Sequence, residues 1–215
     1  RIADAARQIE GAFSLVITTN DSLVGVRDPQ GFRPLCLGKT EHGYVLSSES
    51  CAFDAIKAEF IRDIDPGEMV IIDDRGVRST IYAEPQKIDK KLCVFEYIYF
   101  ARSDSKIDGQ SVYETRLNMG RELYNETKYD ADIVMSIPDS GTTAALGYAR
   151  ASGIPFAEGL IKNRYSGRTF IKPNQEEREL AVRMKLNAMP EVVGGKRIVL
   201  IDDSIVRGTT SGLIV

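Results

Sequence analysis

Two apolar segments in the second half of the chain run into the same kind of loop, and this pattern restricts the possible folds more than any other. Residues 133–137 (IVMSI) and 197–201 (RIVLI) have the length and β-branched content of buried strands. Acidic and small hydroxyl residues follow each segment, and a helical pattern follows those. Such alternation favours a parallel sheet covered by helices. Ligands bind such sheets at the carboxyl ends of the strands, so these two loops form the candidate site.

The chain is predicted to contain two domains with different folds. Residues 1–82 consist mainly of short apolar runs separated by turn residues, which predicts mostly antiparallel strands in an α+β sandwich. The polar stretch 83–92 predicts a linker. Residues 93–215 alternate strands and helices and predict an α/β domain.

Several local elements follow from the same patterns. In the first half we expect one helix near Ser50–Phe60, capped by Ser48 or Ser50, and we expect Glu49 to serve in capping as well. In the second half we expect helices at 111–128, 140–153 and 174–186, and a short strand at 154–160. The aromatic residues Tyr97, Tyr99 and Phe100 are expected in the core.

Composition excludes several classes of protein. The 215 residues carry a net charge of −3, which does not suggest binding to nucleic acid through bulk charge. Three widely spaced cysteines without a CxxC motif are typical of a reducing compartment. No apolar run approaches the roughly 20 residues that span a bilayer, and no secretory signal is visible, so we expect a cytoplasmic protein without a membrane partner. Both ends have the pattern of interrupted helices, which predicts an internal fragment.

The loop after residues 197–201 has the chemistry of a sugar-phosphate site. It begins with Asp202 and Asp203 and continues through Ser204 to the run Arg207, Gly208, Thr209, Thr210 and Ser211. Paired carboxylates can accept hydrogen bonds from vicinal hydroxyls or hold a hydrated divalent cation. Free N–H groups and hydroxyls at a helix start suit a phosphate. The alternative is an ordinary strand-to-helix turn with an acidic cap.

Two further segments add to this site. Asp139, Ser140 and Gly141 follow residues 133–137 and can hold a pyrophosphate and its metal, or simply cap the next helix. Residues 161–185 carry seven basic and three acidic side chains and include the run 162–170 (KNRYSGRTF). Guanidinium groups match phosphate oxygens, and a glycine allows hinge motion, so this segment is a candidate lid; the alternative is a solvated basic loop.

These motifs resemble two related groups of enzymes. The run IVLIDDSIVRGTT is similar to the phosphoribosyl pyrophosphate (PRPP) motif of type I phosphoribosyltransferases. Together with CVFEYIYFARSDS and KNRYSGRTF, it resembles the glutamine PRPP amidotransferases, also called amidophosphoribosyltransferases. EGAFSLVI, DPQGFRPL, SSESCAFD and DPGEMVII are similar to the later part of that family's N-terminal-nucleophile (Ntn) glutaminase domain. The resemblance covers essentially the whole chain.

The resemblance implies an activity and a set of residues. The family makes 5-phosphoribosylamine from PRPP and ammonia released from glutamine, the first committed step of purine synthesis. It implies Mg²⁺ at Ser140, Asp202 and Asp203, with the two aspartates also on the ribose and in catalytic roles. It implies a closing loop with catalytic roles for Lys162, Arg164, Tyr165 and Arg168, and PRPP contacts from Asp139 to Gly141, from Ser204 and from Arg207 to Ser211.

The resemblance also leaves some features open. The glutaminase nucleophile would lie before Arg1, so no residue here is assigned to glutamine hydrolysis. Cys93 matches a ligand of a four-iron four-sulfur cluster in some members, whereas in others a cysteine here is only a buried thiol. Family members are homotetramers or homodimers that purine nucleotides inhibit. Two other functions stay open, a non-catalytic PRPP-binding regulator and a salvage phosphoribosyltransferase that uses a purine base.

Overall fold

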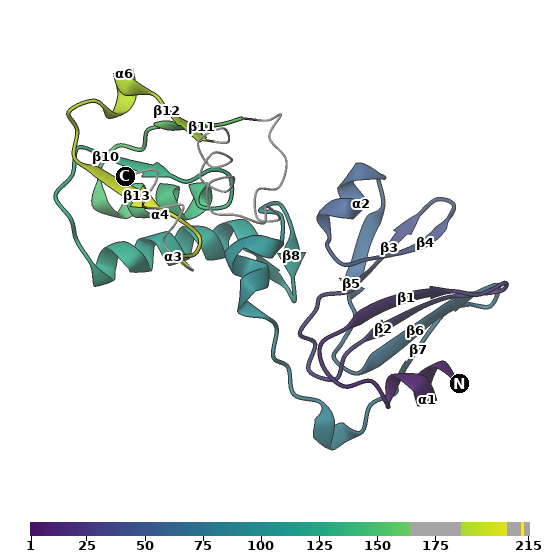
Figure 1. Ribbon diagram of the computed structural model, residues 1–215. Helices are drawn as coiled ribbons and strands as arrows, with labels where there is room; N and C mark the ends of the chain where they lie inside the picture. Colours follow the sequence, from purple (N-terminus) through teal and green to yellow (C-terminus); the bar gives the residue numbers. More distant parts are fainter. Residues whose placement is uncertain (164–185, 206–211, 213–215) are drawn as a thin grey trace, which may run out of the picture. The chain divides into compact units, whose positions relative to one another are not determined.

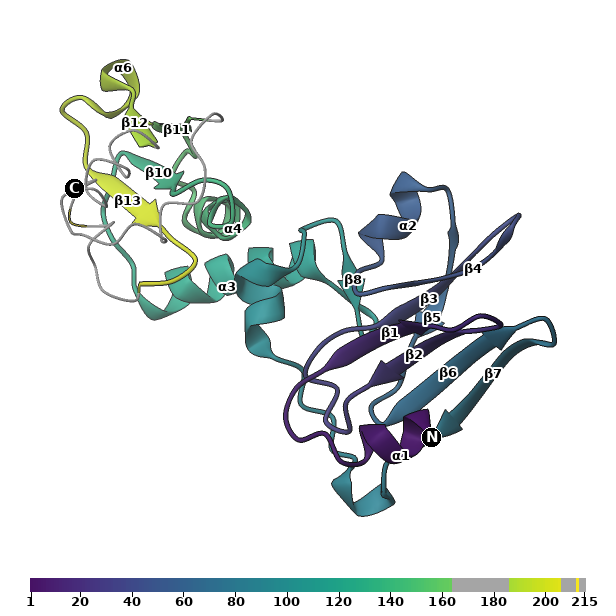
Figure 2. The ribbon, with the colours of Figure 1, turned by 45° about the vertical axis from the view of Figure 1, so that its right-hand side comes forward.

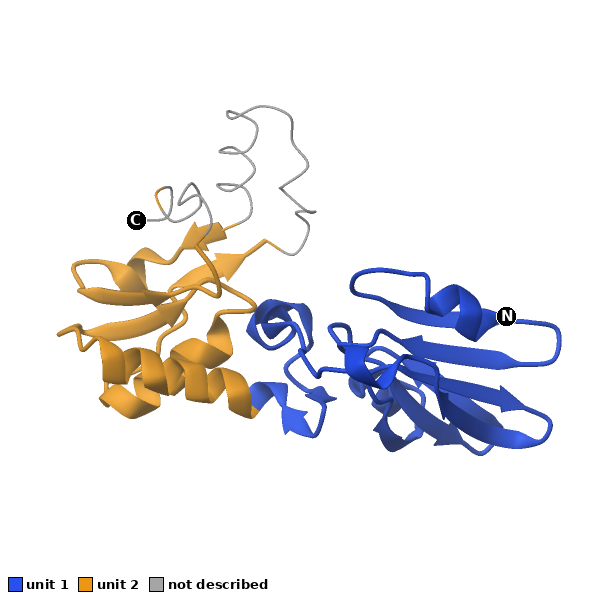
Figure 3. Ribbon diagram, turned by 90° about the horizontal axis from the view of Figure 1, so that it is seen from below, with its two compact units in different colours: residues 1–113 blue, residues 114–215 orange. Residues whose placement is uncertain are grey.

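The computed structural model describes residues 1–163, 186–205 and 212. The chain forms two compact units, Arg1–Tyr113 and Glu114–Val215 (Figures 1 and 3). This division falls beyond the polar stretch 83–92 where the sequence predicts a linker. The identity of the two predicted domains stays a prediction. Among the described residues, no helix is long and apolar enough to cross a membrane.

The first unit is built mainly from two antiparallel sheets. One has the order β1-β2-β6-β7 and the other the order β4-β3-β5. The strands are β1 (Ser14–Thr18), β2 (Leu23–Arg27), β3 (Cys36–Thr40), β4 (Gly43–Ser47), β5 (Glu59–Asp63), β6 (Glu68–Asp73) and β7 (Gly76–Ile81). The predicted antiparallel arrangement is therefore confirmed for these strands.

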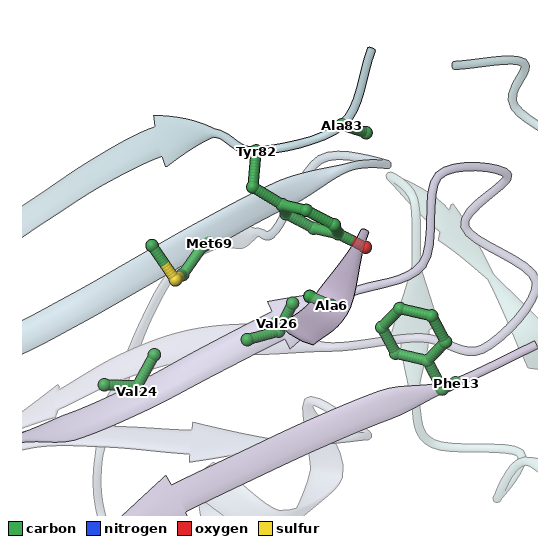
Figure 4. Close-up of a cluster of buried hydrophobic side chains, with 7 residues drawn as sticks. All are labelled: Ala6, Phe13, Val24, Val26, Met69, Tyr82 and Ala83. Carbon is green, nitrogen blue, oxygen red and sulfur yellow. The ribbon is translucent and has the colours of Figure 1, made fainter. Parts of the chain in front are cut away.

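Alternation along the strands places the core on both faces of the larger sheet. Met69 of β6 and Val24 and Val26 of β2 face helix α1 (Ile2–Ala6), which lies against this sheet (Figures 2 and 4). Val70 of β6 points the other way and packs with a second cluster that includes residues of β3. Side chains two apart share a face and adjacent ones do not, so a single strand contributes to both clusters.

The helix expected at Ser50–Phe60 is shorter than predicted. Helix α2 spans Cys51–Ala55, and the chain then forms strand β5 (Glu59–Asp63), which pairs with β3. The prediction was wrong because Glu59 and Phe60 fit a helical pattern as well as a strand, and pairing with β3 decides between the two. Ser50 stands at the helix start, but its side chain does not cap the helix.

The loop after β2 is held by a buried aspartate. Asp28 is fully buried, and its carboxylate accepts hydrogen bonds from the backbone N–H groups of Gln30 (3.0 Å), Phe32 (3.2 Å) and Arg33 (3.3 Å). A carboxylate that takes several backbone donors replaces the water it loses on burial. The acid of DPQGFRPL therefore shapes this loop.

Residues 83–113 belong to the first unit because ion pairs and hydrogen bonds of charged side chains bind them to it. The buried Arg27 binds the carboxylate of Asp108 through both terminal nitrogens, at 2.9 and 3.1 Å, and it also donates to three backbone carbonyls. Burial raises the pKa of Asp108, but the hydrogen bond and charge of Arg27 outweigh burial and hold that pKa below its ordinary value. This stretch contains η1 (Pro85–Lys87), the π-helix η2 (Glu96–Phe100), β8 (Lys106–Ile107) and β9 (Gln110–Ser111).

The second unit has a parallel strand pair with helices, as predicted. Strand β10 (Ile133–Ser136) pairs in parallel with β13 (Ile198–Ile201), and helix α4 (Thr142–Ser152) packs on both (Figure 2). Helix α3 (Val112–Glu126) begins in the first unit and continues into the second. The short elements are β11 (Leu160–Lys162), β12 (Leu186–Ala188) and α6 (Pro190–Val193).

Two other local predictions differ from the structure or fall outside it. Of the strand predicted at 154–160, only a single bridge at Phe156 and the first residue of β11 are present. The helix predicted at 174–186 lies outside the described residues, except for Leu186, which belongs to strand β12.

Helices α3 and α4 cross at two glycines. A Cβ atom on Gly147 would lie 2.1 Å from the carbonyl oxygen of Leu117, and one on Gly120 would lie 1.8 Å from that of Ala144. Real side chains do not approach backbone this closely, so each helix needs glycine at the crossing. This contact sets the position of α4, whose first turn faces the candidate site.

We expect Asp108→Ala to destabilise the first unit by roughly 3–5 kcal/mol, because it leaves the Arg27 guanidinium buried without its counter-charge. The control Asp89→Ala removes an exposed ion pair with Lys91 and should cost less than about 1 kcal/mol. Urea unfolding measures both. The pair's stabilisation is complete above the unfolded aspartate pKa of about 3.9 and is lost as pH falls through the lowered folded pKa. Equal effects of the two substitutions would contradict this assignment.

We expect Gly147→Ala to destabilise the second unit by about 1–3 kcal/mol, because its methyl group forces α3 and α4 apart. This loss outweighs the roughly 1 kcal/mol that alanine gains over glycine within a helix. Arg150→Ala, on an exposed position of the same helix, is the control. Amide hydrogen exchange at Val134 and Ala145 reports the stability of this unit. Unchanged exchange in Gly147→Ala would show that the helices can separate without cost.

Candidate functional site

The parallel register of β10 and β13 brings two loops together. Ser136 lies opposite Ile201, so both strands end at the same edge of the sheet. The N–H of Ile137 donates to the carbonyl of Ile201 at 2.9 Å and continues the pairing by one step. Residues 137–141 and 202–204 therefore leave the sheet as neighbours.

A direct side-chain contact joins the two loops. The hydroxyl of Ser140 donates a hydrogen bond to Oδ2 of Asp203, and the hydroxyl of Ser204 donates to Oδ1 of the same carboxylate at 2.5 Å. The N–H of Asp203 donates to Asp202 Oδ1 at 2.9 Å. Two motifs that are 63 residues apart in the sequence thus share one carboxylate.

The third predicted segment reaches the same edge through its first residue. Lys162 ends strand β11 and forms an ion pair with the exposed carboxylate of Asp139. Strand β11 pairs antiparallel with β12, so Lys162 lies opposite Leu186. The two ends of the stretch between these residues are therefore held together beside the loops. Arg164, Tyr165 and Arg168 lie within that stretch and outside the described residues.

The two adjacent aspartates are both half-buried, but they accept hydrogen bonds from different groups. Burial raises the pKa of Asp202 above its ordinary value; the hydrogen bond from the N–H of Asp203 opposes this rise, and the neighbouring Asp203 charge adds to it. A carboxylate that is poorly solvated and lies beside a like charge gains from a cation or from hydroxyl donors.

The start of helix α4 has no side-chain cap. Gly141 is the residue at the helix start and makes no capping hydrogen bond, while the backbone N–H of Thr142 donates to the carbonyl of Asp139 at 3.3 Å. Asp139 and Ser140 direct their side chains to Lys162 and Asp203 instead, so the alternative in which they cap the helix is not what the structure has. The dipole of the helix makes such a start suitable for an anion.

Gly141 is required by the closeness of the two loops. A Cβ atom there would lie 2.9 Å from the carbonyl oxygen of Ile201 and 3.0 Å from that of Ile137. Sequence reasoning selected this glycine but missed Ser136, whose hydroxyl lies 3.1 Å from that of Thr142 and ties the strand to the helix. The one polar residue in an otherwise apolar strand was the available signal.

The remaining predicted phosphate contacts lie outside the described residues. These are Arg207, Gly208, Thr209, Thr210 and Ser211. Their roles stay predictions.

The donor set suits a magnesium ion. Mg²⁺ is usually held by one or two carboxylates, with water and substrate phosphates completing its shell. Asp202, Asp203 and the hydroxyl of Ser140 provide such oxygens at one place. The described ranges hold no group of three or more His, Cys, Asp or Glu side chains able to bind a metal, either here or around Cys93. Cys93 is a free, half-buried thiol, and its role as a cluster ligand stays a prediction.

Fold and site together define the class of this unit. In the parallel strand pair, two acidic residues follow β13, and a helix that starts at a glycine follows β10. A lysine lies beside these two loops. This arrangement is compatible with a phosphoribosyltransferase domain.

Comparison with known proteins finds relatives of the whole chain. No family model matches the chain. It is 56% identical over 219 residues to the amidophosphoribosyltransferase of Synechococcus elongatus, with all of this chain and 44% of that protein aligned. The amidophosphoribosyltransferase of Methanocaldococcus jannaschii is 52% identical over 227 residues, with all of this chain and 48% of that protein aligned.

Solved structures agree with these relatives. Glutamine PRPP amidotransferase from Bacillus subtilis, complexed with ADP and GMP, matches 98% of this chain and 46% of its own, with 49% identity and a TM-score of 0.89. A structure described as the allosteric regulatory enzyme of purine biosynthesis matches 99% of this chain and 45% of its own, with 49% identity and a TM-score of 0.90. The chain is thus similar along its whole length to amidophosphoribosyltransferases, and it spans less than half of each of these relatives.

We expect Gly141→Ala to push the loop of residues 137–141 away from β13 and to cost about 1–3 kcal/mol, because the added methyl group meets two carbonyl oxygens. The hydrogen bond from Ile137 to Ile201 should break first. Amide exchange at Ile137 measures this directly. Asp139→Ala, in the same loop, is the control, since its exposed side chain can be removed without intruding on the sheet. Protection at Ile137 that survives Gly141→Ala would refute the proposed need for glycine.

Proposed function

We propose that this chain carries the PRPP site of an amidophosphoribosyltransferase. The observation that carries the proposal is the convergence of Ser140, Asp203 and the Lys162–Asp139 pair at the carboxyl end of one parallel strand pair. The 49–56% identity to amidophosphoribosyltransferases along the chain supports it. The intact protein would convert PRPP, glutamine and water to 5-phosphoribosylamine, glutamate and pyrophosphate.

In this proposal the acidic loop holds the sugar. Asp202 and Asp203 accept hydrogen bonds from the vicinal ribose hydroxyls, as adjacent carboxylates at a strand end can. The run from Arg207 to Ser211 surrounds the 5-phosphate. With Ser140, the two aspartates would also hold Mg²⁺, which neutralises charge on the pyrophosphate when it is bound.

The loop after β10 takes the pyrophosphate. The N–H groups at the start of α4 lie next to Gly141. They donate hydrogen bonds to the oxygens of the pyrophosphate. The ammonium group of Lys162 exchanges its exposed partner Asp139 for a phosphate oxygen. Arg164, Tyr165 and Arg168 would complete the enclosure as the segment between β11 and β12 closes over the substrate.

The reaction then needs little from the protein beyond alignment and charge. The nitrogen lone pair of ammonia forms a bond to C1 of the ribose, the bond from C1 to the pyrophosphate oxygen breaks, and the nitrogen gives up a proton. Ammonia is already a nucleophile, so no residue has to activate it. Positioning, stabilisation of the leaving group and exclusion of water provide the catalysis.

The first unit fits the later part of an Ntn-type glutaminase domain. Its two antiparallel sheets, with α1 against the larger one, support that proposal. No residue of this chain is assigned as the glutaminase nucleophile. For the intact protein we also propose purine nucleotides as inhibitors and a homo-oligomeric, cytoplasmic state. The B. subtilis relative is described in complex with ADP and GMP.

We expect Asp202→Asn and Asp203→Asn each to lower PRPP turnover in the intact protein by at least about a hundredfold, since each removes charge that holds the substrate and its cation. Chelation of Mg²⁺ should abolish turnover. The control Asp130→Asn removes an exposed carboxylate that pairs with Arg197 and precedes β10, and it should leave turnover unchanged. Pyrophosphate release with saturating ammonia measures all of these. Wild-type turnover in the double variant would reject the site.

The same assay separates the alternatives. Binding of PRPP without pyrophosphate release at saturating ammonia would indicate a non-catalytic regulator. Release with a purine base such as hypoxanthine, but not with ammonia, would indicate a salvage enzyme.

A further inference from the structure

The last residue of strand β10 is polar and buried, and it contacts the first residue of helix α4. Ser136 is 8% exposed, whereas the residues before it in the strand, Ile133, Val134 and Met135, are apolar. Its hydroxyl oxygen lies 3.1 Å from that of Thr142, which is half-buried and begins the helix. A hydrogen bond between two side chains therefore joins the strand to the first turn of the helix.

Burial indicates which of the two hydroxyls donates this hydrogen bond. Either oxygen can supply the hydrogen atom, because each hydroxyl is both a donor and an acceptor. Ser136 is shielded from water, and among the described residues Thr142 is the acceptor that its hydroxyl contacts. A buried donor without an acceptor is costly, so Ser136 donates and Thr142 accepts. The hydrogen atom of the Thr142 hydroxyl is then left for another acceptor.

The same contact fixes the direction of the Thr142 side chain. A threonine in a helix divides between two χ1 rotamers, because its hydroxyl can also bond to a carbonyl one turn back. The bond from Ser136 selects the rotamer whose hydroxyl lies against the end of the strand. Ser136 in turn lies opposite Ile201, the residue directly before Asp202. The register of the strand pair therefore sets where the Thr142 hydroxyl lies relative to the acidic loop.

Stability alone does not require a polar pair at this position. A hydrogen bond between neutral groups contributes little net stability, and apolar groups of the same shape can replace both partners at almost no cost. The bond is not a helix cap either, because it joins two side chains and involves no backbone N–H. An apolar pair would lack one thing that this pair has, a hydroxyl with a fixed direction at the start of α4.

We propose that Ser136 is a positioning residue that directs the hydroxyl of Thr142 to the pyrophosphate of PRPP. This inference rests on the proposed function, in which the pyrophosphate lies at the start of α4. The Thr142 hydroxyl donates to a pyrophosphate oxygen, and Ser136 holds that hydroxyl in place without touching the substrate. A donor that is already oriented loses less rotational freedom on binding, so the ligand binds more tightly. PRPP and free pyrophosphate present the same oxygens, so the contact strengthens the binding of both.

The test measures two constants in the intact protein with Mg²⁺ present: the KM for PRPP at saturating ammonia, and the Kd of inorganic pyrophosphate by calorimetry. Ser136→Ala should raise each constant between about threefold and tenfold, the effect of one hydrogen bond. Its kcat should fall by less than about twofold, because the contact is present both before and after the bond to C1 breaks.

Ser152→Ala is the matched control. It removes a half-buried serine hydroxyl from the other end of α4, where that hydroxyl donates to the carbonyl of Ala149 at 3.3 Å and accepts from the N–H of Ile154 at 3.2 Å. This change can lower the stability of the helix, but both binding constants should stay within about twofold of wild type. A rise in the control equal to that in Ser136→Ala contradicts the proposal.

Coupling to Thr142 separates positioning from a purely structural role. Thr142→Val removes the hydroxyl at nearly constant volume and should raise both constants at least as much as Ser136→Ala does. Adding Ser136→Ala to Thr142→Val should raise them no further, because the hydroxyl to be positioned is already gone. A structural role of Ser136 predicts instead that the two effects add, and that result overturns the proposal.

Two further outcomes are decisive. Unchanged constants in Ser136→Ala overturn the proposal, and if that variant does not fold, unchanged constants in Thr142→Val overturn it as well. A wild-type protein that releases no pyrophosphate with saturating ammonia rejects the proposed function instead. In that case the calorimetric Kd of pyrophosphate in the same variants still decides the role of Ser136.

Discussion

The parallel pairing of β10 with β13 is the constraint on which the candidate site depends. In a parallel pair both carboxyl ends lie at one edge, and the register that sets Ser136 opposite Ile201 aligns the two loops to within one residue. A shift by one residue would exchange Val134, which packs with α4, for Ile133 and Met135, which pack in the cluster on the other face. The packing of these side chains therefore specifies where Ser140 meets Asp203. Gly141 then lets the loops approach closely enough for that contact.

Sequence patterns were sufficient for the elements whose periodicity is strong. The strands of the first unit other than β5, the parallel pair and the helices α3 and α4 follow from hydrophobic periodicity and from the positions of glycine and proline. Patterns failed where tertiary contacts decide between two local conformations, as at Glu59 and Phe60, which pair with β3 instead of extending α2. They also failed at Tyr99 and Phe100, because an aromatic run does not reveal that it is half exposed. Single residues that bond over long sequence distances leave no periodic signal.

The same contrast between local sequence patterns and long-range contacts explains which parts of the site were predicted and which were missed. Asp202, Asp203, Ser140 and Lys162 were found because each stands in a run whose residue types suit a phosphate ligand, and the structure brings three of these runs to one edge. Ser136 was missed because it belongs to a strand and not to a loop. Glu49 was assigned to capping because its nearest neighbours in sequence suggest a helix start, whereas its partners are more than 50 residues away. The kind of ligand could be predicted from runs of adjacent residues, but hydrogen bonds between residues far apart in the sequence could not.

The hydrogen-bond partners of each carboxylate also show whether it maintains the fold or can exchange its partner for a substrate. In the first unit, Asp28 and Glu49 accept from backbone N–H groups, and Asp108 binds a buried guanidinium. Asp28 and Arg27 are almost completely buried, so breaking these contacts leaves a polar group without water to replace its partner. At the sheet edge of the second unit, Asp139 pairs with a lysine and Asp203 with two hydroxyls. A lysine and hydroxyls can turn to phosphate or ribose oxygens at little cost, because a flexible side chain exchanges one acceptor for another. The acids that suit a substrate are therefore those whose present partners can leave, and the acids that suit a fixed geometry are those whose partners cannot.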